Sequence, residues 1–447
     1  MRSDRTLSVM GCLALLLSAC LDPIAANTLT PPRPPGSTDF SGTVTDSCTG
    51  EPLAGVQVSV CPDGTICTFE TAFFIGTNRG GEFLFPDLAP GRWKVTAALK
   101  DYRISEWTLA LSGGPHAPVV LPLPRVRTPP PTATLDVLFV IDNSTAMEQE
   151  QASLAKAFYR FFRTLTDYPI GVDRPLGLDL HIGVVSTDMG AGGAASCEKQ
   201  EGDGGKLLTR AGCTRPSGGD AFISATTSVG SSLVASNLSG DTVEHAFECI
   251  AQLGTGGCGF EQPLASLVRA VDGVTNPGFL RPGAALAVIV LSDEDDCSAK
   301  NPALYDLAHP ELGPLTSYRC FQLGITCSSN DGAGVKQDCK PGGQYLLDVK
   351  TVADTLKLRR EPQTLYFAVI AGPREPVEVT VEGSDLALRP SCQYIGGVAT
   401  PAGRLSAVAD LLWPYSSFES ICASDLGDTL SGIASRIVTT TLLNPCN

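Results

Sequence analysis

Two strongly apolar segments of the sequence are each followed directly by carboxylate and hydroxyl side chains. Residues 135–141 are followed by Asp142 and Ser144, and residues 284–291 are followed by Asp293. Buried parallel strands end at the same edge of a sheet, so these oxygen atoms would converge if the two strands are neighbours. Carboxylates, hydroxyls and retained waters are the ligands that hard divalent cations prefer. The three side chains are therefore candidate ligands of Mg²⁺, Ca²⁺ or Mn²⁺.

The elements that would position these residues alternate between strands and helices over residues 133–447. Buried strands are predicted at 135–141, 178–185, 284–291 and 365–370. Helical periodicity is found at 147–165, 243–253 and 262–271. Strands without a polar face, separated by helices, are typical of a parallel sheet that is covered on both sides. The sequence therefore predicts a doubly wound, Rossmann-like α/β domain with cysteine-bearing insertions.

This order of strands and polar motifs resembles a von Willebrand factor type A domain. The metal-ion-dependent adhesion site of that family uses an Asp-x-Ser-x-Ser motif, a threonine from a middle loop and an aspartate after the fourth strand. Asp142 matches the aspartate of the motif, Ser144 its first serine, and Asp293 the late aspartate. The resemblance implies that the cation keeps one coordination position open, which an acidic residue of a partner protein fills.

Two positions depart from the family motif. Ala146 stands where the second serine belongs, which removes one hydroxyl ligand. Thr255 is the candidate for the middle-loop threonine, although alignment on the helix that follows would place Cys258 there. Thr187 could instead reach the site from the end of the next strand. Water or Glu294 could replace the missing oxygen.

Each acidic group also has a simpler interpretation. Asp142 by itself could cap a helix, because carboxylates accept hydrogen bonds from the free amides of a first helical turn. Residues 293–296 could form a solvated acidic loop, and we expect Asp295 and Asp296 to be mostly solvated, with a second calcium as the alternative. The occurrence of both motifs at strand ends, in this order, favours the cation site.

Residues 39–124 predict a small all-β sandwich. Apolar and polar residues alternate in this segment, and turn-forming glycines and prolines separate the alternating runs. The segments 41–46, 52–56 and 81–93 resemble the carboxypeptidase regulatory-like family, whose fold is transthyretin-like. This family is a spacer or binding sandwich, and the resemblance implies no catalytic machinery in the module.

The first residues predict an exported lipoprotein. Two arginines precede an apolar stretch, residues 7–17, which is too short to span a bilayer and has the length of a signal-peptide core. The sequence Leu-Ser-Ala-Cys that ends at Cys20 resembles the lipobox of bacterial lipoproteins. It implies a signal peptide at 1–19 and lipid on Cys20, in the outer membrane if the host is Gram-negative. Cleavage after Ala26, which would release a soluble protein, is the alternative.

Two proline-rich segments mark the predicted boundaries between these parts. Residues 20–38 would form a linker behind the lipid anchor, and residues 125–132 a hinge before the α/β domain at 133–447. Proline-rich segments favour extended polyproline geometry and act as semi-rigid spacers. The chain is therefore expected to carry two folded modules in series.

The cysteine content indicates an oxidising compartment. Of 16 cysteines, 14 remain after removal of Cys12 with the signal peptide and lipidation of Cys20. This even number predicts a disulfide framework whose connectivity the sequence does not define. Cys61 and Cys67 could pair locally, whereas Cys48 has no local partner, so one bridge between the modules is expected.

Charge and motifs narrow the class of function. The net charge of −15 argues against nucleic-acid binding, because no basic tract is present to contact phosphates. The sequence has no G-x-S-x-G, H-E-x-x-H or Walker motif, so we do not expect an enzyme. The favoured hypothesis is an extracytoplasmic adhesion or recognition protein with a divalent-cation site. The alternative is a structural scaffold of the cell envelope with a degenerate, metal-free site.

Overall fold

The computed structural model describes residues 37–65, 67, 71–112, 116–125, 132–167, 169–170, 174–175, 177–191, 197, 199–228, 233–306, 309, 312–329, 332–394 and 397–443. The predicted signal peptide, Cys20, and nearly all of the proline-rich linker and hinge lie outside the described residues. The predicted β-sandwich and α/β domain lie largely within them.

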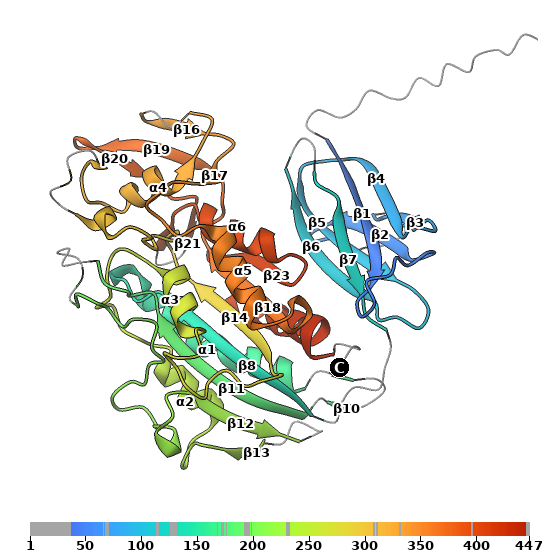
Figure 1. Ribbon diagram of the computed structural model, residues 1–447, viewed down its shortest axis with the longest axis horizontal. Helices are drawn as coiled ribbons and strands as arrows, with labels where there is room; N and C mark the ends of the chain where they lie inside the picture. Colours follow the sequence, from blue (N-terminus) through green and yellow to red (C-terminus); the bar gives the residue numbers. More distant parts are fainter. Residues whose placement is uncertain are drawn as a thin grey trace, which may run out of the picture.

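The N-terminal module is a β-sandwich of two sheets, in the orders β4-β1-β7 and β3-β2-β5-β6 (Figure 1). Buried and less buried residues alternate along strand β1, because one face of its sheet packs on the other sheet. Phe40, Trp93 and Trp107, which come from both sheets, belong to one buried core. The strands are β1 (Thr38–Asp46), β2 (Gln57–Pro62), β3 (Phe73–Gly76), β4 (Glu82–Leu88), β5 (Gly91–Ala98), β6 (Ser105–Leu111) and β7 (Val119–Leu123).

A seven-stranded mixed sheet forms the centre of the second module, in the order β13-β12-β11-β8-β14-β18-β23. Strand β8 pairs in parallel with β11 on one side and with β14 on the other, and β18 and β23 continue the parallel part. The chain leaves β8 toward β11 and later returns to β14, so the winding direction reverses between β8 and β14. The strands are β8 (Thr132–Ile141), β11 (Gly177–Ser186), β12 (Ile223–Thr227), β13 (Leu233–Ser236), β14 (Ala285–Leu291), β18 (Leu365–Ala371) and β23 (Ser416–Ser420).

Two strands at one edge differ from the predicted parallel sheet. Strand β12 runs antiparallel to β11, and β13 runs antiparallel to β12. The residues of β12 alternate between buried and half-buried positions, as in a sheet that is covered mainly on one face. A search for continuous apolar runs misses such strands, because it detects only strands that are buried on both faces.

Helices cover both faces of this sheet (Figure 1). Successive side chains of β8 point to opposite faces, so Val137 and Phe139 pack with helices α1, α2 and α7. Leu138 and Val140 pack with α3, α5 and α6 on the other face. The helices are α1 (Glu148–Thr166), α2 (Val243–Ile250), α3 (Pro263–Ala270), α5 (Val349–Arg359), α6 (Gly403–Leu412) and α7 (Leu426–Ile437).

Insertions with little regular structure follow β14 and β18. They contain one short helix, α4 (Tyr318–Gly324), and several small sheets. The strands of these sheets are β15 (Ile325–Thr326), β16 (Gly334–Lys336), β17 (Lys340–Pro341), β19 (Val377–Glu382), β20 (Asp385–Leu388), β21 (Cys392–Tyr394) and β22 (Gly397–Ala399). A further two-stranded ribbon precedes β11 and consists of β9 (Pro169–Ile170) and β10 (Arg174–Pro175). Because β14 and β18 are parallel, the insertions begin at the same edge of the sheet.

Disulfide bonds hold these excursions together. The described pairs are Cys61–Cys67, Cys197–Cys258, Cys213–Cys249, Cys297–Cys320, Cys327–Cys339 and Cys392–Cys422. The predicted local pairing of Cys61 with Cys67 is therefore confirmed. Cys48 is also disulfide-bonded, and the predicted bridge between the modules falls outside the described residues. This number of disulfides indicates a protein of an extracytoplasmic, oxidising compartment.

The two modules touch through a small set of side chains. Figure 1 shows the sandwich beside the edge of the sheet that β23 forms. Arg92 of the sandwich lies 3.6 Å from the carboxylate of Glu419 in β23 and donates a hydrogen bond of 3.3 Å to the carbonyl of Phe418. Trp413 packs against the core of the sandwich.

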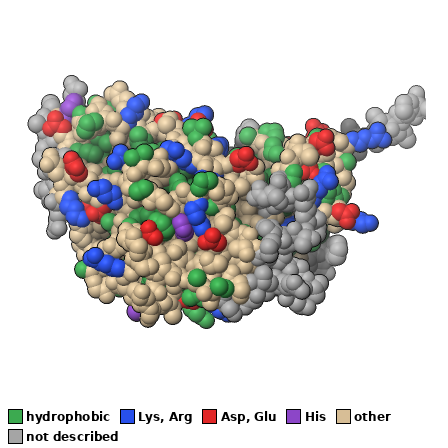
Figure 2. Space-filling model, turned by 60° about the horizontal axis from the view of Figure 1, so that its bottom comes forward, with side chains coloured by type: hydrophobic (Ala, Val, Ile, Leu, Met, Phe, Trp, Pro, Cys, Tyr) green, Lys and Arg blue, Asp and Glu red, His purple; other side chains and the backbone are tan. Residues whose placement is uncertain are grey.

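Figure 2 shows acidic and basic side chains interspersed on one face of the molecule, so the net charge of −15 is not gathered into one patch there. Among the described helices, none combines the length and the apolar character that crossing a membrane requires.

Candidate cation site at the carboxyl edge of the sheet

The ends of β8 and β14 bring the first candidate ligands together. The two strands are neighbours, with Ile141 paired with Leu291 at their last positions, so the condition for convergence that the sequence left open is met. The N–H of Asp142 donates a hydrogen bond of 2.9 Å to the carbonyl of Leu291. The hydroxyl of Ser292 donates to Oδ2 of Asp142 at 2.7 Å. The Asp142 carboxylate is therefore fixed at the point where the winding of the sheet reverses.

The loop after β8 holds Asp142 and Ser144 in a tight turn. The Oδ1 atom of Asp142 accepts the N–H of Ser144 at 2.8 Å. Gln151 of helix α1 donates to the carbonyl of Asp142 at 2.8 Å and so ties the loop to the helix. Helix α1 has Met147 at its N-cap, so Asp142 does not cap this helix. Ala146, where the family motif has a serine, is exposed.

The glycine-rich middle loop, residues 254–258, packs directly on this turn. The N–H of Gly257 donates a hydrogen bond of 2.9 Å to the carbonyl of Asn143. A Cβ atom at Gly257 would lie 2.3 Å from Oδ1 of Asn143, so only glycine allows this approach. The close contact places the middle loop beside the candidate ligands, as the resemblance implies.

The sequence offered Thr255, Cys258 and Thr187 as candidates for the middle-loop ligand. Among the described hydrogen bonds, none joins the side chain of one of these residues to Asp142. Thr255 is half-buried, and among the described contacts its hydroxyl makes none with Asp142. Cys258 is bonded to Cys197, so it has no thiol to offer a cation. Thr187, at the end of β11, donates its hydroxyl hydrogen to Oε2 of Glu261.

Glu261 is the residue of this region that the sequence did not indicate. It lies just before helix α3 and is 1% exposed. Burial raises its pKa well above the usual value, and the charge of Asp142 raises it further. Its Oε1 atom has no hydrogen-bond partner. An acidic residue two positions before a proline-initiated helix, just after a glycine-rich loop, is the signal that could have identified it.

Asp293 is buried among other carboxylates. Its side chain is 6% exposed, and Oδ1 has no hydrogen-bond partner. Burial raises its pKa to about 9, with further contributions from Asp142, Glu294 and Glu150. Burial and the charge of Asp142 raise the pKa of Glu294 to about 7. Glu150 is 3% exposed and also has one oxygen, Oε2, without a partner.

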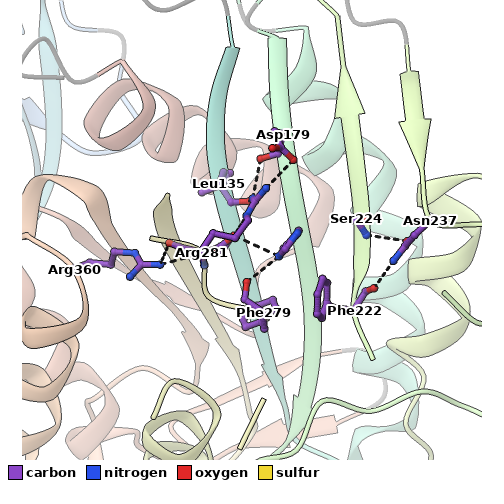
Figure 3. A network of polar contacts seen from close by, with 10 residues as sticks. Leu135, Asp179, Phe222, Ser224, Asn237, Phe279, Arg281 and Arg360 are labelled. Carbon is purple, nitrogen blue, oxygen red and sulfur yellow. Dashed lines mark hydrogen bonds and ion pairs between the residues drawn. The ribbon is translucent and has the colours of Figure 1, made fainter. Parts of the chain in front are cut away.

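Asp136, within β8, is a buried aspartate whose charge is compensated by arginine side chains. Asp136 is fully buried and accepts hydrogen bonds of 2.8 Å from both Nε and the backbone N–H of Arg281. Arg360 approaches the same carboxylate at 3.3 Å. Figure 3 shows Arg281 reaching Leu135 and Asp179, with Arg360 on its other side.

The carboxyl-edge cluster has no comparable basic partner. Within the described part of the chain, its five carboxylates form no ion pair with lysine or arginine; they belong to Asp142, Glu150, Glu261, Asp293 and Glu294. Leaving several buried carboxylates ionised without a cation is costly. Either protons or a bound cation must therefore compensate for their charge.

Asp295 and Asp296 correct one expectation, because neither is a solvated residue. The carboxylate of Asp295 accepts the N–H groups of Arg404 and Leu405 in the first turn of α6, at 2.9 to 3.1 Å. Asp296 is 1% exposed and accepts a hydrogen bond of 3.1 Å from Nε of Arg404. Both residues anchor α6 to the loop after β14.

The donor set of the cluster fits a hard cation. It offers carboxylate and hydroxyl oxygens, which suit Mg²⁺, Ca²⁺ or Mn²⁺ better than zinc or copper. Over the described residues, no three His, Cys, Asp or Glu side chains stand close enough together to form a ready-made ligand group. A bound cation would therefore draw these carboxylates together and would take part of its shell from hydroxyls such as Ser144 and from water.

Comparison with known proteins bears mainly on the sandwich. Residues 39–123 match the family model of the carboxypeptidase regulatory-like domain, which confirms the prediction for this module. The match covers the sandwich alone. No curated protein matches the sequence.

Solved structures resemble the chain only remotely. A pilus adhesin from Streptococcus pneumoniae is 12% identical, with a TM-score of 0.19, over 58% of this chain and 42% of that one. A putative carbohydrate binding protein from Pseudomonas aeruginosa is 14% identical, with a TM-score of 0.16, over 20% of this chain and 88% of that one. The 5-hydroxyisourate hydrolase of Klebsiella pneumoniae is 20% identical, with a TM-score of 0.15, over 20% and 94%. These likenesses are too weak to support a function.

Proposed function

We propose that the α/β domain is a recognition module of the von Willebrand factor A type, which binds a partner protein outside the cytoplasm through a divalent cation. The candidate ligands Asp142, Ser144 and Asp293 lie where ligands bind in doubly wound folds, beyond the carboxyl ends of the strands at the switch point. The observation that carries the proposal is the group of buried carboxylate oxygens without partners, Oδ1 of Asp293 among them.

In this proposal the cation forms the link to the partner. Asp142, Ser144 and Asp293 hold it, and water completes the shell in the absence of a partner. An aspartate or glutamate of the partner then replaces a water, which concentrates much of the affinity in one contact. The disulfide-bonded insertions after β14 and β18 begin at the same edge and would supply specificity.

The N-terminal part of the chain has a positioning role in the proposal. Lipid on Cys20 would hold the protein on the outer face of a membrane, and the sandwich would act as a spacer below the recognition module. The chain is proposed to be a binding protein and not an enzyme. Replacement of Cys20 by serine should move the protein from the membrane fraction to the soluble fraction, and an unchanged distribution would contradict the anchor.

Cation binding is tested directly by calorimetry. The purified full-length protein is titrated with Mg²⁺, Mn²⁺ and Ca²⁺, beside Asp142→Asn and Asp293→Asn. Asp354→Asn, which alters an exposed ion pair with Lys350 on α5, is the matched control. We expect one site in the parent protein and in the control, and none in the two site variants. Absence of heat and of a thermal shift with all three ions would overturn the proposal.

A binding experiment on the immobilised protein distinguishes the recognition role from the role of a metal-free scaffold. Envelope proteins are passed over the immobilised protein in calcium and again with a chelator, using the parent protein and Asp142→Asn. The proposal expects a partner that is retained only by the parent protein with cation present. A scaffold with a degenerate site would assemble equally well in all four cases.

A further inference from the structure

We infer that Glu261 is a direct ligand of the cation and takes the coordination position that neither Ala146 nor the middle-loop threonine supplies. The inference rests on the proposed cation site and extends it by one carboxylate. Thr255, Cys258 and Thr187 were the sequence candidates for this position, and one of them, Thr187, donates its hydroxyl hydrogen to Glu261, which follows the middle loop.

The side chain of Glu261 has one satisfied oxygen and one free oxygen. Oε2 accepts the hydroxyl hydrogen of Thr187, which fixes the orientation of the carboxyl group. Oε1 has no partner although the residue is 1% exposed. Thr187 donates its backbone N–H to the carbonyl of Ile141 at 3.2 Å, so the residue that holds Glu261 is bonded to the position just before Asp142. A rigid, buried acceptor beside another carboxylate is the arrangement that a cation between them would satisfy.

The backbone around Glu261 is held from two directions. Its carbonyl accepts the N–H of Cys297 at 2.6 Å, which links it to the loop after β14. The N–H of Gln262 donates to the carbonyl of Thr187 at 3.1 Å, which links it to the end of β11. Helix α3 begins at Pro263. The position of the carboxyl group is therefore set by three elements of the fold, as expected of a ligand held before the cation arrives.

A shared proton between Glu261 and Asp142 is the alternative explanation. One proton would satisfy that pair, but it would leave Oδ1 of Asp293 and Oε2 of Glu150 without partners. A divalent cation compensates for the charge of the whole group, and it draws Asp293 toward the pair at the same time. The cation therefore accounts for more of the unpaired oxygens than the proton does.

A third carboxylate changes which cation the site prefers. Magnesium usually keeps several waters and takes one or two carboxylates from a protein, whereas calcium accepts six to eight oxygens, often from several carboxylates. Asp142, Asp293 and Glu261 together would give three carboxylates. The site should therefore bind Ca²⁺ more tightly than Mg²⁺, and Glu261 should be the origin of that preference.

The test compares Ca²⁺ and Mg²⁺ affinities of the full-length protein with those of Glu261→Gln. The amide oxygen of glutamine can still accept the hydrogen bond of Thr187, so the fold should persist. We expect Ca²⁺ affinity to fall by at least about tenfold and Mg²⁺ affinity to change much less. Thr187→Val, which releases the carboxyl group from its orientation, should cause a smaller loss for Ca²⁺. Glu201→Gln, at an exposed position, is the matched control.

Thermal unfolding without cation gives a second readout. A merely structural role predicts that Glu261→Gln lowers the melting temperature and leaves both affinities unchanged. A ligand role predicts an equal or higher melting temperature, because glutamine keeps the hydrogen bond from Thr187 and avoids the cost of burying an acidic group without a cation. Unchanged Ca²⁺ affinity in Glu261→Gln, with binding abolished in Asp142→Asn, would overturn this inference and leave the proposed site intact. No binding by the parent protein would overturn both.

Discussion

At the scale of single residues, β8 and the loop that follows it carry two buried aspartates in opposite environments. Asp136 is paired with Arg281 and Arg360, whereas Asp142 lies among carboxylates. Removing one partner of a buried ion pair typically costs about 3–5 kcal/mol, because the other charge stays buried and unpaired. Removing one of several like charges relieves repulsion instead. The two positions should therefore respond to the same substitution with opposite signs.

We predict that Asp136→Asn lowers the free energy of unfolding by about 3 kcal/mol or more, while Asp142→Asn leaves it unchanged or raises it. The measurement is urea unfolding of both variants in the presence of a chelator, so that no cation contributes. Added calcium should then stabilise the parent protein and not Asp142→Asn. A large loss of stability in cation-free Asp142→Asn would show that its hydrogen bonds outweigh the repulsion.

The sandwich contains a carboxylate with a lowered pKa, which predicts sensitivity to acid. Burial alone would raise the pKa of Asp46, but hydrogen bonds from Arg125, Cys48 and Tyr102 outweigh it and lower the pKa to about 2. The unfolded chain has the higher pKa, so the stabilisation is present above about pH 4 and is lost as the pH falls toward 2.

Asp46→Asn should therefore destabilise the protein at neutral pH by about 1–2 kcal/mol, a figure reduced for the half-exposed Arg125. The difference between variant and parent should shrink between pH 4 and pH 2 in denaturant titrations. A difference that stays constant over this range would mean that the hydrogen bonds do not depend on the charge of Asp46.

The residues of the site divide into those that the sequence indicated and those that it did not. Asp142, Ser144 and Asp293 were predictable, because each follows an apolar run and such runs end at one edge of a parallel sheet. Glu261 was not, because alignment on the following helix pointed to Cys258, whereas the carboxylate beside Asp142 comes from the position two residues before Pro263. In the proposed site a carboxylate takes the place of a hydroxyl ligand, and such a replacement breaks the motif by which the site would be recognised.

At the scale of elements, β11, β14 and β18 were predicted within one residue of their observed ends, whereas β8 begins three residues before its predicted start. Strands β12 and β13 were missed because they are short and lie in the antiparallel part. The disulfide pairing could not be predicted from the sequence either, because cysteines far apart in the chain, such as Cys197 and Cys258, are bonded to each other in the fold.

The Cys197–Cys258 bridge attaches the middle loop to the excursion that follows β11. Closing a loop of 61 residues stabilises the fold by about 4 kcal/mol in the entropy model. Replacing both cysteines by serine should loosen the middle loop against Asn143, weaken cation binding and expose the loop to protease. Calorimetry and limited proteolysis measure the two effects.

The matched control is the Cys327–Cys339 bridge, which closes a loop of 12 residues within the β15–β17 insertion. Its double serine variant should retain the cation affinity of the parent protein, because this bridge lies in a separate insertion after β14. Equal loss of affinity in both variants would indicate general destabilisation in place of a local effect on the site.

At the scale of the whole molecule, the division into two modules followed from the sequence, but their arrangement did not. Proline-rich segments and the change from alternating to continuous apolar patterns marked the boundary. The placement of the sandwich beside β23 depends on a few contacts, such as Arg92 with Glu419, that no local pattern indicates. The number of modules is thus a property of local composition, whereas their orientation depends on single surface residues.

The position of β8 has a mechanical consequence. This strand leads in from the sandwich and ends one residue before Asp142, and it is paired with β11 and β14 along most of its length. Tension between the N-terminus and a partner held at the site would run along the axis of β8. Its hydrogen bonds on both sides would then be loaded in shear and would have to break together. Single-molecule pulling in this geometry should find that the α/β module resists force strongly, and stepwise unzipping at low force would contradict this expectation.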